Sequence, residues 1–255
     1  MGEKATILYS QTKNLATRQF MLKKLKSILH RRRAKIRGKK FKRASQVLRD
    51  EGYYSQCGQD KFVHEVLYPH KKDGIFVDIG ANDGVTLSNT YFFEKAGWTG
   101  LAVEPIPAAF EKLCANRQCA VVQGCVGEMP GKVKFRAIEG YSEMLSGIVD
   151  EYDAKHAERI QKEIKEKGGS YEDIEINCHT LADLLQEHDI NSVDYMSIDV
   201  EGAELSILKG IDFDKVEIQA ISVENSYAND HIQHFLASKG FKLSCIVGDE
   251  FYIKQ

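Results

Sequence analysis

One continuous stretch, Gly74 to Glu104, constrains the fold more than any other part of the chain. It opens with a short apolar run at residues 75–79, passes through an acidic turn rich in glycine, and ends after a second apolar run. A short apolar run bounded by glycine is typical of a parallel strand that is covered on both faces. The stretch therefore predicts a buried strand, a tight turn, a helix and a second strand that ends in a carboxylate.

The turn of this stretch favours one kind of ligand over another. Gly80 and Gly84 permit backbone angles and a close ligand approach that a side chain would block. A dinucleotide places its pyrophosphate on a turn of the form G-x-G-x-x-G, but here Asn82 replaces the middle glycine. Asp78 and Asp83 would repel a diphosphate, whereas they attract the sulfonium and ammonium groups of S-adenosylmethionine. The charges favour a methyl donor over a dinucleotide.

Glu104 ends the second apolar run, about twenty residues beyond the turn, where an acid can accept hydrogen bonds from both hydroxyls of a ribose. Pro105 follows and stops the strand. Taken separately, Asp78 could be a turn carboxylate and Glu104 a solvated strand end. Their ordered combination predicts a site for a nucleoside cofactor.

A second acidic turn follows the apolar run at residues 193–198. Asp199 stands directly after this predicted strand, where ligands bind in open α/β sheets. We expect Asp199 to be the catalytic base, with Glu201 as the second candidate. Glu204 is interpreted as a helix-start residue, because the helix dipole stabilises negative charge there.

A divalent metal ion is an open alternative to a general base. Glu224 ends the apolar run at residues 218–223 and would reach the same sheet edge if the two strands are neighbours. Asp199, Glu201 and Glu224 would then supply hard oxygen ligands that lower the pKa of a bound hydroxyl group. His179, beside Thr180 at a predicted helix start, is interpreted as structural.

Five segments, in this order, resemble the FkbM family of S-adenosylmethionine-dependent methyltransferases: SQCGQDKFV, FVDIGANDGVTLSNT, AVEP, HTLADLL and YMSIDVEGAELSILKGI. The resemblance runs from Tyr54 to Tyr252. It implies the class I methyltransferase fold, a Rossmann-like α/β fold with a mostly parallel seven-stranded sheet, an antiparallel C-terminal edge and helices on both faces. It also implies methyl transfer to a hydroxyl group of a sugar, a glycan, a polyketide or a related secondary metabolite.

The resemblance assigns roles by position. Asp78, Gly80, Asn82 and Glu104 match the family's cofactor motifs, Asp199 matches the acid after the fourth core strand, and Gln59 matches a shared upstream element. Asp83 and Gly84 complete the predicted cofactor turn, and Asp199 is expected to contact the cofactor as well as to act as the base. Two other classes stay open: an adenosyl-binding module without turnover that acts through a basic N-terminal arm, and an NAD-dependent oxidoreductase. Asn82 and Asp78 disfavour the oxidoreductase.

Alternating segments predict a mostly parallel sheet. Strands are expected near residues 75–79, 100–104, 119–123, 132–136, 174–178, 194–198, 217–223, 241–246 and 250–254. Gly248-Asp249 predicts a hairpin between the last two. Residues 137–169 are interpreted as an insertion whose helix, at residues 152–167, has a narrow apolar stripe at Ile160 and Ile164. That helix is either a lid over the cleft or a solvated helix.

The chain of 255 residues can bury one substantial core, so we expect one catalytic domain at residues 46–255 and an extension at residues 1–45. The net charge of −2 hides an asymmetry. Residues 18–43 hold 13 of the 35 Lys and Arg and no acid, while the other 22 face 37 Asp and Glu, a net charge of −15. Within that basic segment, Met21, Leu22, Leu25, Ile28 and Leu29 would share one helix face.

A basic amphipathic segment of this kind binds an anionic membrane surface. The acidic remainder disfavours nucleic acid as a partner, and a solvated leader or a helix packed on another subunit stays open. Six cysteines without paired metal spacing and no signal peptide predict a reduced, cytoplasmic protein, peripheral to the membrane if the segment binds lipid. The expected acceptor is a small molecule or a glycan, and the sequence makes no prediction of oligomeric state.

Overall fold

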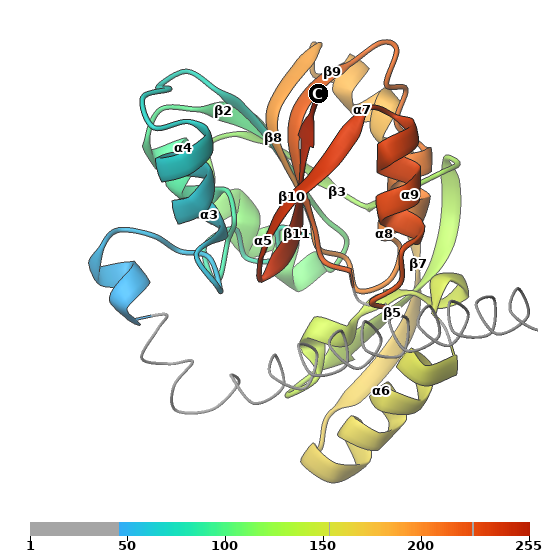
Figure 1. Ribbon diagram of the computed structural model, residues 1–255. Helices are drawn as coiled ribbons and strands as arrows, with labels where there is room; N and C mark the ends of the chain where they lie inside the picture. Colours follow the sequence, from blue (N-terminus) through green and yellow to red (C-terminus); the bar gives the residue numbers. More distant parts are fainter. Residues whose placement is uncertain (1–45, 153, 226) are drawn as a thin grey trace, which may run out of the picture. The chain divides into compact units, whose positions relative to one another are not determined.

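The computed structural model describes residues 46–152, 154–225 and 227–255, and a seven-stranded sheet lies at the centre of the unit from Val47 to Gln255 (Figure 1). The predicted extension at residues 1–45, with its basic segment at residues 18–43, lies outside the described residues. All six cysteines carry free thiols.

The main sheet has the strand order β10-β11-β9-β8-β1-β2-β3. The first five strands in chain order pair in parallel, whereas β11 runs antiparallel to both β9 and β10. This arrangement confirms the predicted fold class, including its antiparallel C-terminal edge, and the hairpin turns at Gly248, whose φ is 73°. The strands are β1 (Ile75–Ile79), β2 (Thr99–Glu104), β3 (Ala120–Gln123), β8 (Ser192–Ile198), β9 (Glu217–Val223), β10 (Phe241–Val247) and β11 (Asp249–Lys254).

The strand order reverses at β1. From β1 the chain adds β2 and then β3 on one side, and it later places β8 on the other side of β1. In open α/β sheets, ligands bind outside the carboxyl ends of the strands at such a reversal. The ends of β1 and β8 therefore mark the place where a site is expected.

Helices cover both faces of the main sheet (Figure 1). Along each strand, side chains alternate between the faces, so Val77 and Met196 point into one core while Phe76 and Tyr195 point into the other. One face is covered by α7 (Leu181–Glu187), α8 (Glu204–Lys209) and α9 (His231–Ser238). The other is covered by α3 (Gln59–Phe62), the single π-helical turn η1 (Val63–Leu67), α4 (Tyr91–Lys95) and α5 (Pro107–Asn116).

A second, four-stranded sheet has the order β4-β7-β5-β6. It contains two of the predicted strands, both longer than expected, and two that sequence patterns missed. The missed strands have three and two residues, too few to show an alternating pattern. The four strands are β4 (Cys125–Gly127), β5 (Gly131–Glu139), β6 (Gly147–Ile148) and β7 (Ser170–Thr180).

The predicted insertion helix exists as α6 (Ala154–Lys167) and is not a solvated helix. Ile160 is fully buried against Ile138 and Leu145, and Ile164 packs on the same small core. The apolar stripe read from the sequence therefore attaches α6 to the second sheet. Two short 3-10 helices, η2 (Glu143–Leu145) and η3 (Val149–Glu151), precede it.

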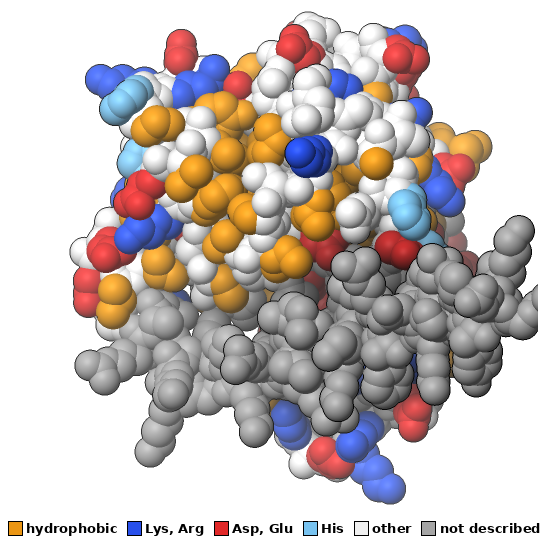
Figure 2. All heavy atoms as spheres, viewed as in Figure 1, with side chains coloured by type: hydrophobic (Ala, Val, Ile, Leu, Met, Phe, Trp, Pro, Cys, Tyr) orange, Lys and Arg blue, Asp and Glu red, His pale blue; other side chains and the backbone are white. Residues whose placement is uncertain are grey.

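Figure 2 shows apolar side chains gathered on the face that carries α3, α4 and the edge strand β10. Val66 and Ile246 are the more exposed large apolar residues of η1 and β10. Lys242 is exposed on the same edge strand, and a charge of this kind opposes pairing between the edges of two sheets. Within the described ranges, no helix combines the length and the apolar composition that crossing a lipid bilayer requires.

Candidate active site

The turns after β1 and β8 lie against each other at the strand reversal. The backbone N–H of Asp199 donates to the carbonyl oxygen of Ile79 at 3.1 Å. Gly80 has a φ of 87°, and a Cβ atom at this position would collide with the carbonyl oxygen of Asp199. The packing of the two turns alone therefore requires glycine at position 80, whether or not a ligand binds there.

Asp78 is buried beneath the turn, where other side chains engage its carboxylate. The Thr90 hydroxyl donates to Asp78 Oδ2 at 2.5 Å, Ser88 adds a second hydroxyl bond, and the Arg117 guanidinium lies 3.8 Å away. Burial raises the pKa of Asp78, and the charge of Arg117 and these hydrogen bonds oppose that rise. Asp78 therefore joins β1 to the segment that covers it.

Arg117 is a key residue of the site that sequence reasoning missed. Its side chain has no exposed area, and its Nε donates to Glu94 Oε2 at 2.9 Å. Its Nη2 donates to the Thr90 hydroxyl at 3.0 Å, and its Nη1 donates to the Gly84 carbonyl oxygen at 3.2 Å. One guanidinium thus connects the glycine turn with the start of α4. No local pattern points to it, because all of its partners are distant in the chain.

Asp83 and Gly84 hold the turn in shape. Asp83 Oδ1 accepts the backbone N–H groups of Val85 and Thr86 at 2.9 and 2.7 Å, and Oδ2 accepts the Thr86 hydroxyl at 2.6 Å. Burial acts to raise the pKa of Asp83, but these hydrogen bonds outweigh it and the pKa lies below its usual value. A Cβ atom on Gly84 would press on Leu113 and Arg117.

Glu104 joins the end of β2 to the glycine turn, so two of the predicted cofactor elements do lie together. Its Oε2 accepts the backbone N–H of Asn82, and its Oε1 accepts that of Ile106, both at 2.8 Å. Asn82 adopts a left-handed conformation with a φ of 50°. Burial raises the pKa of Glu104 to about 7, against the effect of the two backbone bonds.

Asp199 and Glu224 meet at the ends of the neighbouring parallel strands β8 and β9. The Glu224 N–H donates to the Ile198 carbonyl oxygen at 3.0 Å, and the two carboxyl groups are hydrogen-bonded to each other. Burial, followed by the charges of Glu224, Asp249 and Glu201, raises the pKa of Asp199 well above its usual value. Burial and the neighbouring carboxyl groups therefore favour the protonated form of Asp199.

Gln59 brings the upstream segment to this group of carboxylates. Its side chain is buried, its Oε1 accepts the Cys57 N–H at 2.8 Å, and its Nε2 donates to Asp249 Oδ2 at 2.9 Å. Asp249 begins β11, next to the end of β9. The sequence identified Asp249 only as a hairpin residue, because its closeness to Asp199 depends on strand order.

The alternative of a metal site at Asp199, Glu201 and Glu224 finds no support. Among the residues that the structure describes, no three His, Cys, Asp or Glu side chains are grouped so that they could hold a metal ion. The carboxyl groups of Asp199 and Glu224 are instead hydrogen-bonded to each other. Glu201 follows in a left-handed conformation, with a φ of 56°. Glu204 begins α8 and accepts the Gly202 N–H at 2.9 Å, the helix-start role predicted for it.

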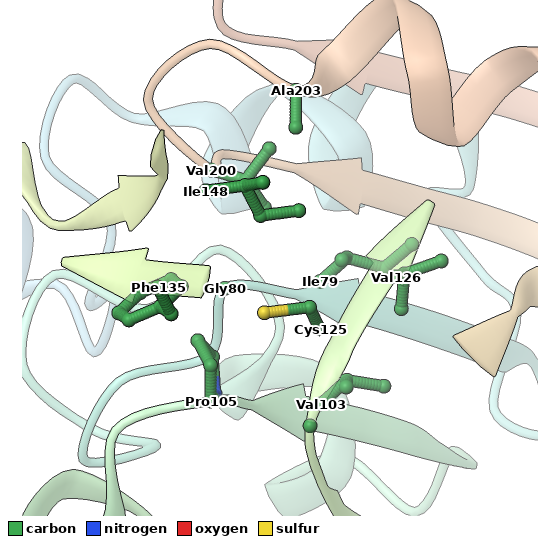
Figure 3. Close-up of a pocket in the computed structure, with 11 residues that line it drawn as sticks. Ile79, Gly80, Val103, Pro105, Cys125, Val126, Phe135, Ile148, Val200 and Ala203 are labelled. Carbon is green, nitrogen blue, oxygen red and sulfur yellow. The ribbon is translucent and has the colours of Figure 1, made fainter. Parts of the chain in front are cut away.

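An apolar pocket opens beside Gly80, on the opposite face of the sheet from Asp78 (Figure 3). The space between its lining atoms is about 300 Å³, counting space that is open to solvent, and about 30 Å³ of it admits the centre of a water molecule. Figure 3 shows Ile148 beside Val200, and Phe135 near Pro105. Of the predicted site residues, only Gly80 lines it; the full lining is Ile79, Gly80, Val103, Pro105, Gly124, Cys125, Val126, Phe135, Ile148, Val200 and Ala203.

The insertion reaches the site through the segment before α6. Ile148 of β6 lines the pocket. The Asn82 side chain donates to Met144 Sδ at 3.9 Å, and the Tyr227 hydroxyl donates to the Glu151 carbonyl oxygen at 2.9 Å. Residues 143–151 therefore contact both the glycine turn and the loop that follows β9.

Comparison with known proteins gives one family. The model of the methyltransferase FkbM domain matches residues 78–243. "Methyltransferase 1" of Beauveria bassiana is 25% identical over 218 residues, which cover 72% of this chain and 82% of that protein. "Methyltransferase sdnD" of Sordaria araneosa is 28% identical over 198 residues, which cover 66% and 73% of the two chains.

Among solved structures, the chain is similar to the crystal structure of methyltransferase FkbM from Methylobacillus flagellatus KT. The TM-score is 0.45 and the sequence identity 15%. The match covers 71% of this chain and 44% of the bacterial one, so the chain spans less than half the length of that protein.

Proposed function

Because the chain belongs to the FkbM methyltransferase family, as the family match over residues 78–243 establishes, we propose that it transfers a methyl group from S-adenosylmethionine to a hydroxyl group of a sugar, glycan or secondary metabolite. Family membership supplies the methyl transfer. We propose two further points: that the methyl donor is S-adenosylmethionine, and that the acceptor is a hydroxyl group. One observation carries it: Glu104 is bonded to the glycine turn, and Gly80 of the same turn lines an apolar pocket.

The residues present fit the proposed donor. The pocket between Pro105 and Val200 has an apolar lining, which suits a flat adenine ring. Glu104 can accept hydrogen bonds from ribose hydroxyl groups once its carboxylate is ionised. The carboxyl groups at the ends of β8 and β9 favour a cation nearby. When bound, S-adenosylmethionine would supply an electrophilic methyl group on a positively charged sulfur.

The role proposed for the chain's own residues is first to position both reactants. Good orientation of the two reactants lowers the activation free energy by up to about 7–11 kcal/mol, while a general base raises the rate by roughly 10²–10⁴-fold. Asp199 remains the proposed base, with Glu201 as the other candidate. The raised pKa of Asp199 bears on this role, because its carboxyl group must be ionised before it can take a proton from an acceptor hydroxyl.

Two measurements test the proposal. Calorimetry should give a binding isotherm with S-adenosylhomocysteine and none with NAD. Incubation with isotopically labelled S-adenosylmethionine and a panel of sugars, glycans and small hydroxyl compounds should then give a labelled methyl ether. If wild-type protein binds neither S-adenosylmethionine nor S-adenosylhomocysteine, the proposed donor is wrong.

Turnover of the wild-type protein separates an enzyme from a binding module, and the Asp199→Asn variant then tests the proposed base. Asparagine can keep the hydrogen bond to Glu224 but cannot accept a proton from the acceptor. We expect donor binding within a few-fold of wild type and a rate about 10²–10⁴-fold lower. An unchanged rate would move the role of base to Glu201.

A further inference from the structure

Asn89 carries a buried acceptor atom that the fold leaves without a hydrogen bond. The residue is 7% exposed, and its Nδ2 donates to the Ser197 hydroxyl at 2.9 Å. Its Oδ1 accepts nothing, and across residues 46–152, 154–225 and 227–255 it is the one buried side-chain nitrogen or oxygen atom without a partner. Buried polar groups in native proteins are nearly always paired, so this atom calls for a ligand or another explanation.

Asn89 stands at the strand reversal, where a ligand is expected. Its neighbours Ser88 and Thr90 both bond to Asp78, at the end of β1. Its own partner, Ser197, lies in β8 two residues before Asp199. The amide therefore bridges the carboxyl ends of the two strands on either side of the reversal.

The amide and the apolar pocket lie on opposite faces of the sheet edge. Ile79 lines the pocket, and side chains alternate along a strand, so the preceding Asp78 points to the other face. Ser197 shares the face of Tyr195 by the same alternation. A ligand that crossed the edge at Gly80 would meet the pocket at one end and Asn89 at the other.

We propose that Asn89 Oδ1 accepts a hydrogen bond from the α-ammonium group of bound S-adenosylmethionine. This inference rests on the proposed function and adds a binding residue to it. The group that bonds to Asn89 Oδ1 must be a hydrogen-bond donor, and an ammonium group has three N–H donors and no acceptor. The group of carboxyl groups around Asp199, which includes Glu224 and Asp249, favours a cation over a neutral donor. Asn89 and the apolar pocket would then hold the two ends of one molecule.

A pair of ligands isolates the contact. S-adenosylhomocysteine and its deamino analogue share adenine, ribose, thioether and carboxylate, and differ only in the amino group. In Asn89→Leu we expect the affinity for S-adenosylhomocysteine to fall by roughly ten- to a hundredfold, as for a hydrogen bond to a charged group. The affinity for the deamino analogue should change by less than about threefold. Asn191→Leu, at an exposed asparagine, is the matched control and should change neither.

Unfolding of the ligand-free variant provides a readout that does not depend on the donor. Leucine removes the unpaired acceptor but also the bond to the Ser197 hydroxyl, so the two changes oppose each other and the unfolding midpoint of Asn89→Leu should stay close to that of wild type. If Asn89→Leu does not fold, Asn89→Asp replaces it: this side chain keeps an acceptor, so it should still prefer S-adenosylhomocysteine to the deamino analogue by at least the wild-type ratio.

The inference is overturned if Asn89→Leu weakens both ligands alike or weakens neither, or if Asn89→Asp loses the preference. A wild-type protein that binds S-adenosylhomocysteine and its deamino analogue equally well also overturns it. A wild-type protein that binds neither ligand contradicts the proposed donor instead, so the two failures can be told apart.

Discussion

The two sheets of this protein hold their charged side chains in different ways. In the main sheet, the Arg117 side chain has no exposed area and contacts Glu94 and Asp78 in the interior. In the second sheet, Arg136 makes a two-pronged bond to Asp173 at 2.7 and 2.8 Å, but both side chains are about a fifth exposed, at 18% and 22%. The better ion-pair geometry thus occurs where the charges are less buried.

This contrast separates a fixed part of the site from a supporting one. Around β1 and β8, buried side chains specify the shape of the glycine turn, and losing one leaves others unpaired. The second sheet adds apolar side chains, Phe135 and Ile148, to the wall of the pocket, while its charged pairs face water. We expect substitutions in the first region to affect folding most and those in the second to affect ligand fit.

The largest effect should come from removing the buried guanidinium. Arg117→Met leaves the carboxylates of Asp78 and Glu94 buried without their cation, which costs about 3–5 kcal/mol in the free energy of unfolding. Arg136→Met is the matched control in the second sheet and should cost less than about 1 kcal/mol. Urea denaturation measures both. Similar losses in the two variants would show that burial does not distinguish the two regions.

The next effect concerns the pH dependence of donor binding. The pKa of Glu104 is raised to about 7, and only the ionised carboxylate can accept both ribose hydroxyl groups. Donor affinity should therefore fall as the pH falls through 7. Between pH 8 and pH 6 we expect roughly tenfold weaker binding of S-adenosylhomocysteine by calorimetry, because one unit below its pKa only about a tenth of the carboxyl group is ionised.

Two variants control for other carboxyl groups. Glu104→Gln should bind S-adenosylhomocysteine more weakly than wild type, and its affinity should not change between pH 6 and pH 8. Asp199→Asn should show the same tenfold change in affinity as wild type. The stability of the ligand-free protein should change in the opposite direction. The folded pKa of Glu104 lies above the unfolded value, so its contribution to the free energy of unfolding is lost as the pH rises towards 7. A Glu104→Gln variant with the wild-type pH profile would contradict the assignment.

The arrangement of the main sheet was predictable from the sequence for two reasons. Each of its motifs lies within a short stretch of sequence, and the carboxyl ends of neighbouring parallel strands lie side by side. Glu104 and the turn at Asn82 are far apart in the chain, but each directly follows a strand, and neighbouring parallel strands bring their ends together. The hairpin at Gly248 was also predictable, since a left-handed turn residue between two apolar runs has few other uses.

The same reasoning could not assign partners across the fold. The carboxylate of Asp78 bonds to Ser88 and Thr90 and lies beside Arg117, and none of these contacts has a sequence pattern. Asp249 joins the carboxyl groups near Asp199 only because β11 returns beside β9. Such contacts depend on strand order and helix placement, which a periodic pattern does not encode.

A smaller effect should distinguish the pocket wall from the core behind it. Ile148 and Ile174 belong to the same apolar cluster of the second sheet, but only Ile148 lines the pocket. Truncating each to alanine should lower the free energy of unfolding. Only Ile148→Ala should also weaken S-adenosylhomocysteine binding, by about 1 kcal/mol or roughly fivefold, since the ligand loses about one methylene's worth of apolar contact. Equal losses of affinity in both variants would place the ligand elsewhere.

The smallest effect tests the connection between the two regions. Tyr227→Phe removes the hydrogen bond to the Glu151 carbonyl oxygen, which joins the loop after β9 to the insertion. Both residues are half-buried, so water can replace the bond and we expect a loss of about 0.5 kcal/mol, at the low end for a neutral hydrogen bond. Hydrogen exchange should rise in residues 143–151 and stay unchanged in β1 and β8.

Tyr152→Phe, which removes a bond to Leu145 within the insertion, is the control. If Tyr227→Phe instead loosens β8, the loop after β9 supports the main sheet itself, and the division between a fixed and a supporting region fails at that loop.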